Sequence, residues 1–112
     1  MLSKEKRIRD ASDFKRVYQK GAFFYHNLFN VNYLKNRTSL TRVGFVIGKK
    51  VSNKATVRNN LKRKFRESAR HLYEELPKGY DIVINIKKEA LGKKQKELET
   101  EIQRALQKIG KK

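Results

Sequence analysis

The stretch RVGFVIGKKVSNKATVRNNLKRKFRESAR, residues 42–70, decides the fold. It opens as a strand, because the β-branched and aromatic side chains of Val43, Phe45 and Ile47 recur at every second position, as on a half-buried sheet. A polar loop follows, and then a long helix. One face of this helix is apolar at steps of three and four residues, through Val57, Leu61, Phe65, Ala69, Leu72 and Leu76. The stretch therefore predicts a strand, a loop and a long amphipathic helix.

A second face of the same helix is basic. Its residues, here named the basic ridge, recur every four positions and are Arg58, Lys62, Arg66 and Arg70. Lys54 lies one turn earlier, and Arg63 lies beside the ridge. Like charges at this spacing repel one another and destabilise an isolated helix. We therefore expect the basic ridge to have an anionic partner.

The chain as a whole is strongly basic. Lys and Arg number 29 against 11 Asp and Glu, which gives a formal net charge of +18 and a pI near 10.4. This excess predicts a polyanionic partner, with nucleic acid as the first candidate and an anionic membrane surface as the second. The length of 112 residues indicates one domain, 1–112, and its core must be modest because only 38% of residues are hydrophobic.

Two absences in the sequence narrow the class of protein further. The chain has no cysteine, which excludes disulfides and thiolate metal sites. It also has no apolar run long enough to span a membrane and no apolar signal region after Met1. We therefore expect a cytoplasmic protein.

The N-terminal half of the chain is predicted to add one helix and two strands. We expect residues 1–9 to be extended or frayed, and a short helix to run between an N-cap at Ser12 and a C-cap at Gly21. Two strands are expected at 22–25 and 28–34. The simplest arrangement is a hairpin that joins the second of them to the strand that comes next in the sequence.

The C-terminal half is predicted to add a strand and a helix. Pro77 and Gly79 end the long helix, and the very hydrophobic run 80–86 predicts a central strand. A last helix is expected at about 93–109, with a frayed end at 110–112. The order αβββαβα predicts an α+β fold with one mixed four-stranded sheet packed by helices, and it contains a βαβ unit if the two flanking strands are parallel.

No group of residues suggests chemistry carried by the chain itself. His26 and His71 lie far apart in the sequence without a metal-ligand spacing, so we expect both on the surface. The acidic residues cluster on helices and are expected to be solubilising charge. No serine lies in a nucleophile elbow, and no glycine-rich loop has phosphate-binding spacing. We predict no catalytic residue and no metal ligand.

The aromatic residues of the first helix leave two interpretations open. Phe14 and Tyr18 fall on one helical face together with Val17. They either pack in the core, as aromatic residues usually do, or form a partly exposed binding surface.

Several segments of the chain resemble the protein subunit of bacterial ribonuclease P. They are RVG at 42–44, KKV at 49–51, KATVRNNLKR at 54–63, RE at 66–67 and KGYDIV at 78–83, together with the first helix. The hallmark of that family is an Arg-Asn-Arg helix start followed by Lys-Arg and then Arg-Glu. This chain departs from the family at Asn60, where the third hallmark residue is usually basic, and at Gly48, Ser52 and Asn53 in the loop.

The resemblance implies a division of labour. In this family the RNA subunit is the catalyst and uses Mg²⁺ to cleave precursor tRNA, which leaves a mature 5′ phosphate. The protein binds that RNA and also holds the single-stranded 5′ leader of the substrate. The protein alone is then expected to be inactive, to bind no cofactor and to need no other protein partner.

The resemblance also implies a particular fold and two sets of site residues. The fold is of the ribosomal protein S5 domain 2-like type, whose βαβ crossover is left-handed, against the general preference. The RNA subunit would be bound by Arg58, Asn59, Asn60, Lys62, Arg63, Arg66 and Arg70. The leader would be bound by Phe14, Tyr18, Lys49, Lys50, Lys54 and Lys87. Aromatic residues suit the second role, because a base can stack on one for about 1–3 kcal/mol with little sequence preference.

Three other interpretations remain open. A structural RNA-binding protein of ribosomal type, with no role in tRNA processing, would carry the basic ridge but would have no use for an aromatic leader cleft. A membrane binder would need a free apolar helix face, whereas the long helix needs that face to cover the sheet. A nuclease that is active without RNA would need the carboxylate cluster that the sequence lacks.

Overall fold

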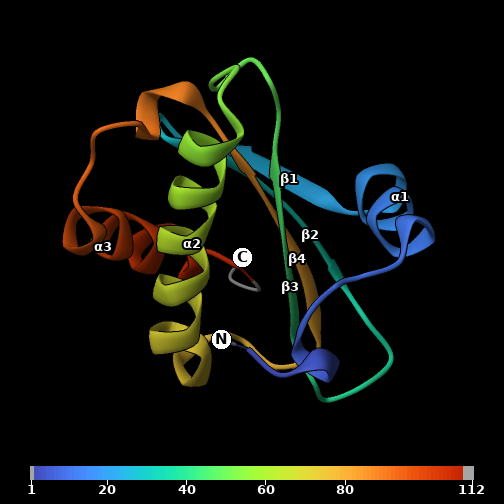
Figure 1. The fold of residues 1–112 in the computed structure, drawn as a ribbon. Helices are drawn as coiled ribbons and strands as arrows, with labels where there is room; N and C mark the ends of the chain where they lie inside the picture. The colour runs from blue at the N-terminus through green and yellow to red at the C-terminus, as the bar shows by residue number, and fades with distance from the viewer. Residues whose placement is uncertain (1, 110–112) are drawn as a thin grey trace.

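The computed structural model describes residues 2–109, so the predicted fraying of 110–112 lies outside the described residues. Within that range the elements follow the predicted order αβββαβα, with short 3-10 turns between them (Figure 1). They are η1 (Lys4–Lys6), α1 (Ala11–Lys20), β1 (Ala22–Tyr25), β2 (Phe29–Lys35), β3 (Arg42–Ile47), α2 (Ala55–Leu72), η2 (Tyr73–Glu75), β4 (Tyr80–Ile86), η3 (Lys88–Ala90) and α3 (Gln95–Leu106).

The four strands form one mixed sheet in the order β1-β2-β4-β3. β2 is antiparallel to β1 and to β4, whereas β3 and β4 are parallel. The predicted hairpin between β2 and β3 is therefore wrong, because β4 lies between them. β4 is the most hydrophobic strand and takes the central position, where both of its faces are covered. The prediction of a central strand at 80–86 is confirmed.

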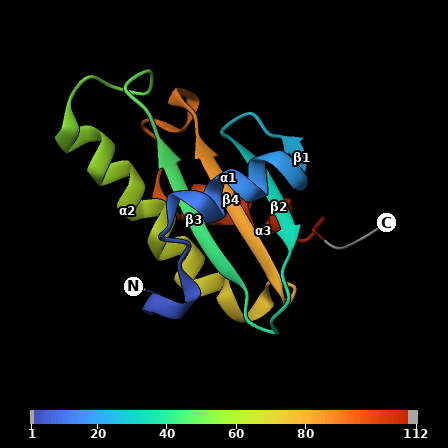
Figure 2. The same cartoon turned by 90° about the vertical axis from the view of Figure 1, so that its right-hand side faces the viewer.

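The βαβ unit from β3 through α2 to β4 has a left-handed crossover. In Figure 2 both strands run upward, β4 lies to the right of β3, and α2 lies behind the sheet. Seen from the side of α2, the second strand therefore lies to the left of the first. This is the handedness that the family resemblance implied, and it is an exception to the general preference.

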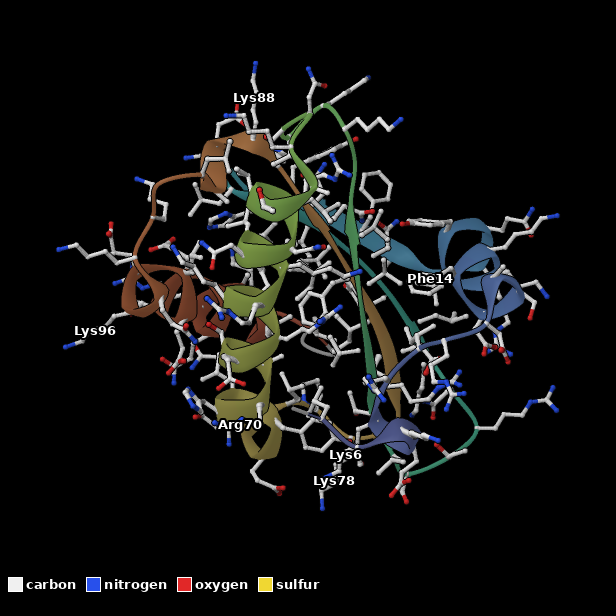
Figure 3. All side chains as sticks on the ribbon, viewed as in Figure 1. Lys6, Phe14, Arg70, Lys78, Lys88 and Lys96 are labelled. Carbon is white, nitrogen blue, oxygen red and sulfur yellow. The ribbon has the colours of Figure 1, made fainter. Side chains whose placement is uncertain are left out.

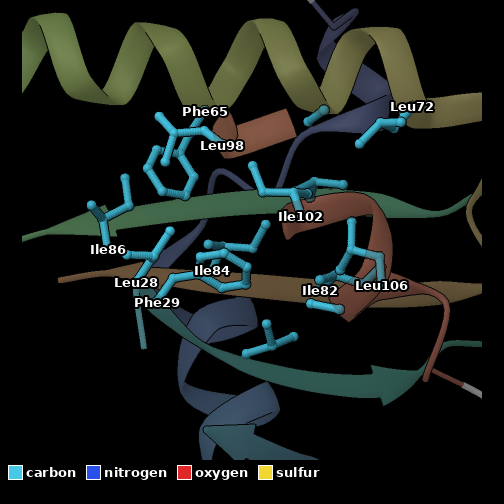
Figure 4. Close-up of a cluster of buried hydrophobic side chains, with 14 of the residues drawn as sticks. Leu28, Phe29, Phe65, Leu72, Ile82, Ile84, Ile86, Leu98, Ile102 and Leu106 are labelled. Carbon is cyan, nitrogen blue, oxygen red and sulfur yellow. The ribbon is translucent and has the colours of Figure 1, made fainter. Parts of the chain in front are cut away.

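The main core lies between the sheet and the pair α2 and α3 (Figures 1 and 4). Phe65 of α2 is fully buried, and its ring meets that of Phe29 edge-on at 5.9 Å between centroids. The apolar face predicted for the last helix is buried throughout, at Leu98, Ile102, Ala105, Leu106 and Ile109, but α3 ends at Leu106, so Ile109 lies beyond it. The apolar stripe predicted on the long helix is buried too, except that Val57 is half-buried and Leu76 lies beyond the end of α2.

α1 covers part of the opposite face of the sheet (Figure 2). A small second core holds it there, made by Ile8, Val17 and Val83, with Phe14 and Leu34 packed against it. The helix begins at Ala11 after an N-cap at Asp10, two residues earlier than predicted, and its C-cap is Gly21 as predicted.

The prediction that residues 1–9 are extended or frayed is confirmed only in part for the described residues: Arg7 is extended and bridges Val43, whereas Lys4–Lys6 form a 3-10 turn and the segment is held on the sheet. Leu2 is buried in the main core and Ile8 in the second core. The Ile8 backbone N–H also donates to the carbonyl of Val43 at 3.1 Å, so the segment runs along the edge of β3. Two apolar side chains in a charged segment are enough to bind it to the sheet, because each gains about 1.5–3 kcal/mol on burial.

A single buried carboxylate connects α1, the β2–β3 loop and both parallel strands. Asp81 of β4 accepts hydrogen bonds from Arg42 Nε at 3.0 Å, Arg42 Nη2 at 2.7 Å, Asn36 Nδ2 at 2.9 Å and Arg16 Nη2 at 3.1 Å. Burial by itself would raise the pKa of Asp81. The hydrogen bonds from Arg42 and Asn36 outweigh that effect, so the pKa of Asp81 lies below its ordinary value.

We expect Asp81→Asn to lower the free energy of unfolding by roughly 2–3 kcal/mol at pH 7, measured by urea denaturation. This is less than the cost of breaking a fully buried pair, because Arg42 keeps Asp13 at 3.3 Å as a second partner. A folded-state pKa below the unfolded value means that the wild type gains this stability above about pH 4 and loses it as the pH falls through the folded pKa. The variant should lack that part of the acid dependence of stability.

The matched control is Glu89→Gln, an exposed carboxylate on η3, which should change stability by less than about 0.5 kcal/mol. Equal stability of Asp81→Asn and the wild type would contradict the assigned role.

Candidate nucleic-acid interface

α2 presents the basic ridge on the side that does not pack on the sheet. Arg58, Lys62 and Arg66 are half-buried, and Arg70 is exposed. Burial, together with the charge of Arg66 one turn away, lowers the pKa of Lys62. The repulsion expected from the sequence spacing is therefore present in the fold. The apolar face of α2 is buried against the sheet, which removes the free surface that the membrane alternative requires.

Side-chain hydrogen bonds orient several residues around the ridge. Arg58 Nη1 donates to the carbonyl of Ser52 at 2.8 Å and so ties the helix to the loop before it. Arg63 donates to Asn60 Oδ1 at 2.7 Å, whereas Asn59 is exposed. The departure from the family hallmark at Asn60 therefore gives Arg63 a fixed partner.

A cleft of about 570 Å³ lies between α1, β3, the N-terminal segment and α2. Phe14 and Tyr18 line it from α1, and Lys62 and Arg66 line it from α2. The structure therefore brings the predicted leader-binding aromatic pair together with two residues that were assigned to the RNA-subunit surface. Arg7 and Arg9, which sequence reasoning did not single out, also line this cleft.

Of the two interpretations of the aromatic pair, core packing describes Phe14 and a partly exposed surface describes Tyr18. Phe14 is half-buried against the second core, and its ring occupies the space above Gly44, where a Cβ would lie 2.7 Å from Phe14 Cε1. Tyr18 is 43% exposed, and its hydroxyl donates to Asn85 Oδ1 at 2.6 Å. Partial burial raises the pKa of Tyr18, and the bond to Asn85 opposes that shift. Phe14 is thus part of the packing, and Tyr18 belongs to the surface.

The predicted leader-binding lysines lie outside the cleft that Phe14 and Tyr18 line. Lys49, Lys50 and Lys54 are exposed on the loop between β3 and α2, and Lys54 is the N-cap residue of α2. Lys87 follows β4, and its Nζ donates to the carbonyl of His26 at 2.6 Å. These four lysines are not among the described residues that line the cleft with Phe14 and Tyr18.

An exposed aromatic pair on β1 lies on the same side of the sheet as Tyr18. Phe23 and Tyr25 are 58% and 73% exposed, and their rings meet edge-on at 5.3 Å between centroids. The strand register places Tyr25 in one row with Asn30, Asn85 and Val46. The alternation of the sequence FFY at 23–25 could have revealed which two rings face outward, once the partner strand was known.

The two histidines have different surroundings. His26 is half-buried, contrary to the prediction, because it stacks on Phe29 at 4.3 Å between ring centroids and pairs with Glu101 at 3.1 Å. His71 is exposed as predicted, and its Nδ1 lies 2.8 Å from Glu99 Oε1. Within residues 2–109, no group of three or more His, Cys, Asp or Glu is placed to hold a metal ion. No helix in the same range is long and apolar enough to cross a membrane.

The fold and this surface define a basic α+β protein with a charged helix face beside an aromatic cleft, a combination suited to binding RNA. The family model Ribonuclease P matches residues 2–110. A protein of Clostridium botulinum (strain Langeland), named ribonuclease P protein component, is 34% identical over 108 residues, which cover 96% of each chain. A protein of the same name from Synechocystis is 36% identical over 92 residues, 81% of this chain and 74% of its own. The structure of the RNase P protein from Thermotoga maritima superposes with a TM-score of 0.85 at 31% identity, over 92% of this chain and 96% of that one.

The chain therefore belongs to the family of ribonuclease P protein components. Members of this family are part of an endoribonuclease holoenzyme that processes the 5′ end of tRNA. Of the interpretations that the sequence left open, the structural protein of ribosomal type is not favoured.

We expect Gly44→Ala to destabilise the protein by about 1–3 kcal/mol, because the added methyl group overlaps the ring of Phe14. The matched control is Gly48→Ala, where an added Cβ would meet nothing within 4 Å and should change stability little. A double-mutant cycle with Phe14→Leu, read by thermal and urea unfolding, should show that the two substitutions are not additive. Additive effects would show that Gly44 does not hold the ring in place.

Proposed function

We propose that this chain uses two adjoining surfaces in the holoenzyme. The outer side of α2, with the half-buried Arg58 and the exposed Arg63 and Arg70, binds the catalytic RNA. The cleft beside α1 binds the single-stranded 5′ leader of precursor tRNA. The observation that supports this division best is the composition of the cleft, in which Tyr18 faces the same space as Lys62 and Arg66.

An aromatic ring beside cations matches the chemistry of a single strand. Bases have π-faces that stack on a ring with little sequence preference, and their phosphates are attracted by ammonium and guanidinium groups. Tyr18 has the exposure needed for stacking, and its hydroxyl is anchored on Asn85, so the ring is held in one orientation. A leader of any sequence could be held there. Lys49, Lys50, Lys54 and Lys87 then bind phosphates outside this cleft, along the exposed loop and the end of β4.

The proposal gives the chain no catalytic group and no metal of its own. The family is Mg²⁺-dependent at its RNA, and the protein's part is to hold RNA while its positive charge reduces the repulsion between two polyanions. In this view the cleavage of precursor tRNA belongs to the RNA subunit, and the protein works in the cytoplasm beside its RNA partners without another protein.

The first test is cleavage by the separate parts. We expect the purified protein, freed of RNA, to show no specific cleavage of precursor tRNA. Adding the cognate RNA subunit at low Mg²⁺ should restore 5′ processing, because the polycation replaces part of the screening that Mg²⁺ otherwise supplies. The readout is the mature 5′ end on a denaturing gel, and the RNA subunit alone at the same Mg²⁺ is the control. Specific 5′ processing by the RNA-free protein would contradict the proposal.

The second test separates the two surfaces. Tyr18→Leu should weaken binding of precursor tRNA to the holoenzyme by about 5–150-fold, the value of one base stack, and should leave binding of mature tRNA unchanged. The control Tyr18→Phe keeps the ring and should bind nearly as the wild type does. The triple variant Arg58→Ala, Arg63→Ala and Arg70→Ala should instead weaken binding to the RNA subunit. Its salt dependence should flatten by about 0.7–0.9 log units for each phosphate that the variant no longer neutralises.

The outcome of this comparison depends on folding, so each variant is also melted. Because Tyr18 is 43% exposed, its truncation should lower the melting temperature little. If Tyr18→Leu weakened the binding of precursor and mature tRNA in parallel, the leader would have to lie outside this cleft.

A further inference from the structure

A second groove, here named the basic groove, lies on the other side of α1 from the cleft. Its volume is about 990 Å³, and the N-terminal segment, α1 and the β2–β3 loop form its walls. Val17 is buried under α1 and separates the two flanks of the helix. Phe14 and Tyr18 lie on the flank that faces the cleft, and Arg16 and Lys20 lie on the flank that faces the basic groove. Arg7 and Arg9 line both spaces, but Lys20, Lys35 and Arg37 line only the basic groove, so a strand in the cleft leaves these three cations uncovered.

The charge of the basic groove is strongly unbalanced. Eight basic residues line it against three acidic ones. Arg42 and Arg16 are committed to Asp81 and Asp13 by ion pairs of 2.7–3.5 Å, so their charge is largely compensated. Five other basic residues of the lining are exposed: Lys4, Arg9, Lys20, Lys35 and Arg37. In Figure 3, nitrogen atoms gather accordingly between α1 and the β2–β3 loop.

The loop that carries two of these cations is held in one conformation. Asn36 donates to the carbonyl of Leu40 at 3.0 Å and accepts from the Thr38 backbone N–H at 2.9 Å. Its own backbone N–H donates to the carbonyl of Gly79 at 2.7 Å. Gly79 has a φ of +82°, and a Cβ there would lie 2.8 Å from the carbonyl oxygen of Thr38. The loop is therefore pre-organised, which lowers the entropy that a ligand would have to overcome on binding.

The basic groove differs from the cleft in that none of the described residues that line it is aromatic. A single strand bound by stacking has no platform here, whereas a backbone of paired RNA needs only cations and hydrogen-bond donors. We propose that the basic groove binds the phosphate backbone of a base-paired RNA segment without reading its sequence. This goes beyond the two surfaces proposed above and does not depend on them.

Two base-paired RNAs are present in the holoenzyme, so the experiment has two arms. The test variant is Lys20→Ala, Lys35→Ala and Arg37→Ala, which removes three exposed charges from the basic groove. One arm measures its affinity for the RNA subunit across a salt series. The other measures binding of mature tRNA, which has no leader, to the assembled holoenzyme. Weaker binding in the first arm assigns the groove to the catalytic RNA, and weaker binding in the second assigns it to the body of tRNA.

We expect affinity to fall about ten-fold or more in one arm, with a salt slope that flattens by about 0.7–0.9 log units for each phosphate no longer neutralised. The matched control, Lys88→Ala, Lys94→Ala and Lys96→Ala, removes the same charge from η3 and the start of α3 and should bind much closer to the wild type. Figure 3 shows Lys88 and Lys96 on the side of the molecule away from α1. A charge-keeping variant, Lys20→Arg, Lys35→Arg and Arg37→Lys, should bind as the wild type does and shows that the fold is intact. Unchanged affinity in both arms, or an equal decrease in the control, would overturn the proposal. Because neither arm uses the leader, failure here is distinct from failure of the leader site.

Discussion

The ion pair between Asp81 and Arg42 is the interaction on which the α1 side of the molecule depends. A buried carboxylate is costly unless it is paired and fully hydrogen-bonded, and here, near the start of β4, four hydrogen bonds satisfy it. Their donors come from α1, from the β2–β3 loop and from β3. The second core under α1 is small, so hydrophobic contact alone would fix this helix weakly. The network fixes the helix, and with it the walls of the cleft and of the basic groove.

The same network shows how a chain of net charge +18 folds at all. Self-repulsion of this size opposes the compact state. The fold reduces it by pairing the cations that must be near the sheet, Arg16 and Arg42, with buried or half-buried carboxylates. The remaining cations are left on the surface, where water and salt screen them. On α2 the repulsion is relieved only in part: Arg70 pairs with Glu67 at 3.0 Å, whereas burial and then the charge of Arg66 lower the pKa of Lys62. An RNA that covers this helix would supply the missing negative charge.

Local patterns predicted the elements well and their arrangement less well. The β3 strand, the loop, α2 and the apolar face of α3 follow from periodicities of two and 3.6 that burial imposes directly. The β2–β3 hairpin failed because sequence neighbours were paired, whereas the more hydrophobic β4, more than forty residues after β2, takes the central place. The N-terminal segment was expected to fray because its many charges hid Leu2 and Ile8. Local sequence patterns carry no signal for the handedness of the crossover, so it was predicted only from the family resemblance.

For the site residues too, the sequence predicted residue types better than their positions in the fold. The aromatic pair and the basic ridge could be picked from the sequence, because residue type and helical spacing already identify them. Which of them share a space could not, since that depends on how α1 and α2 sit on opposite faces of the sheet at the edge formed by β3. Lys62 and Arg66 of α2 line the same cleft as Tyr18, so under the proposed function a strand bound there would run alongside an RNA bound to α2. Two RNAs held this close would repel strongly, and Lys62 and Arg66 would then lie between them and reduce that repulsion. The sharing of residues between the two surfaces is thus what a protein that joins a catalytic RNA to its substrate requires.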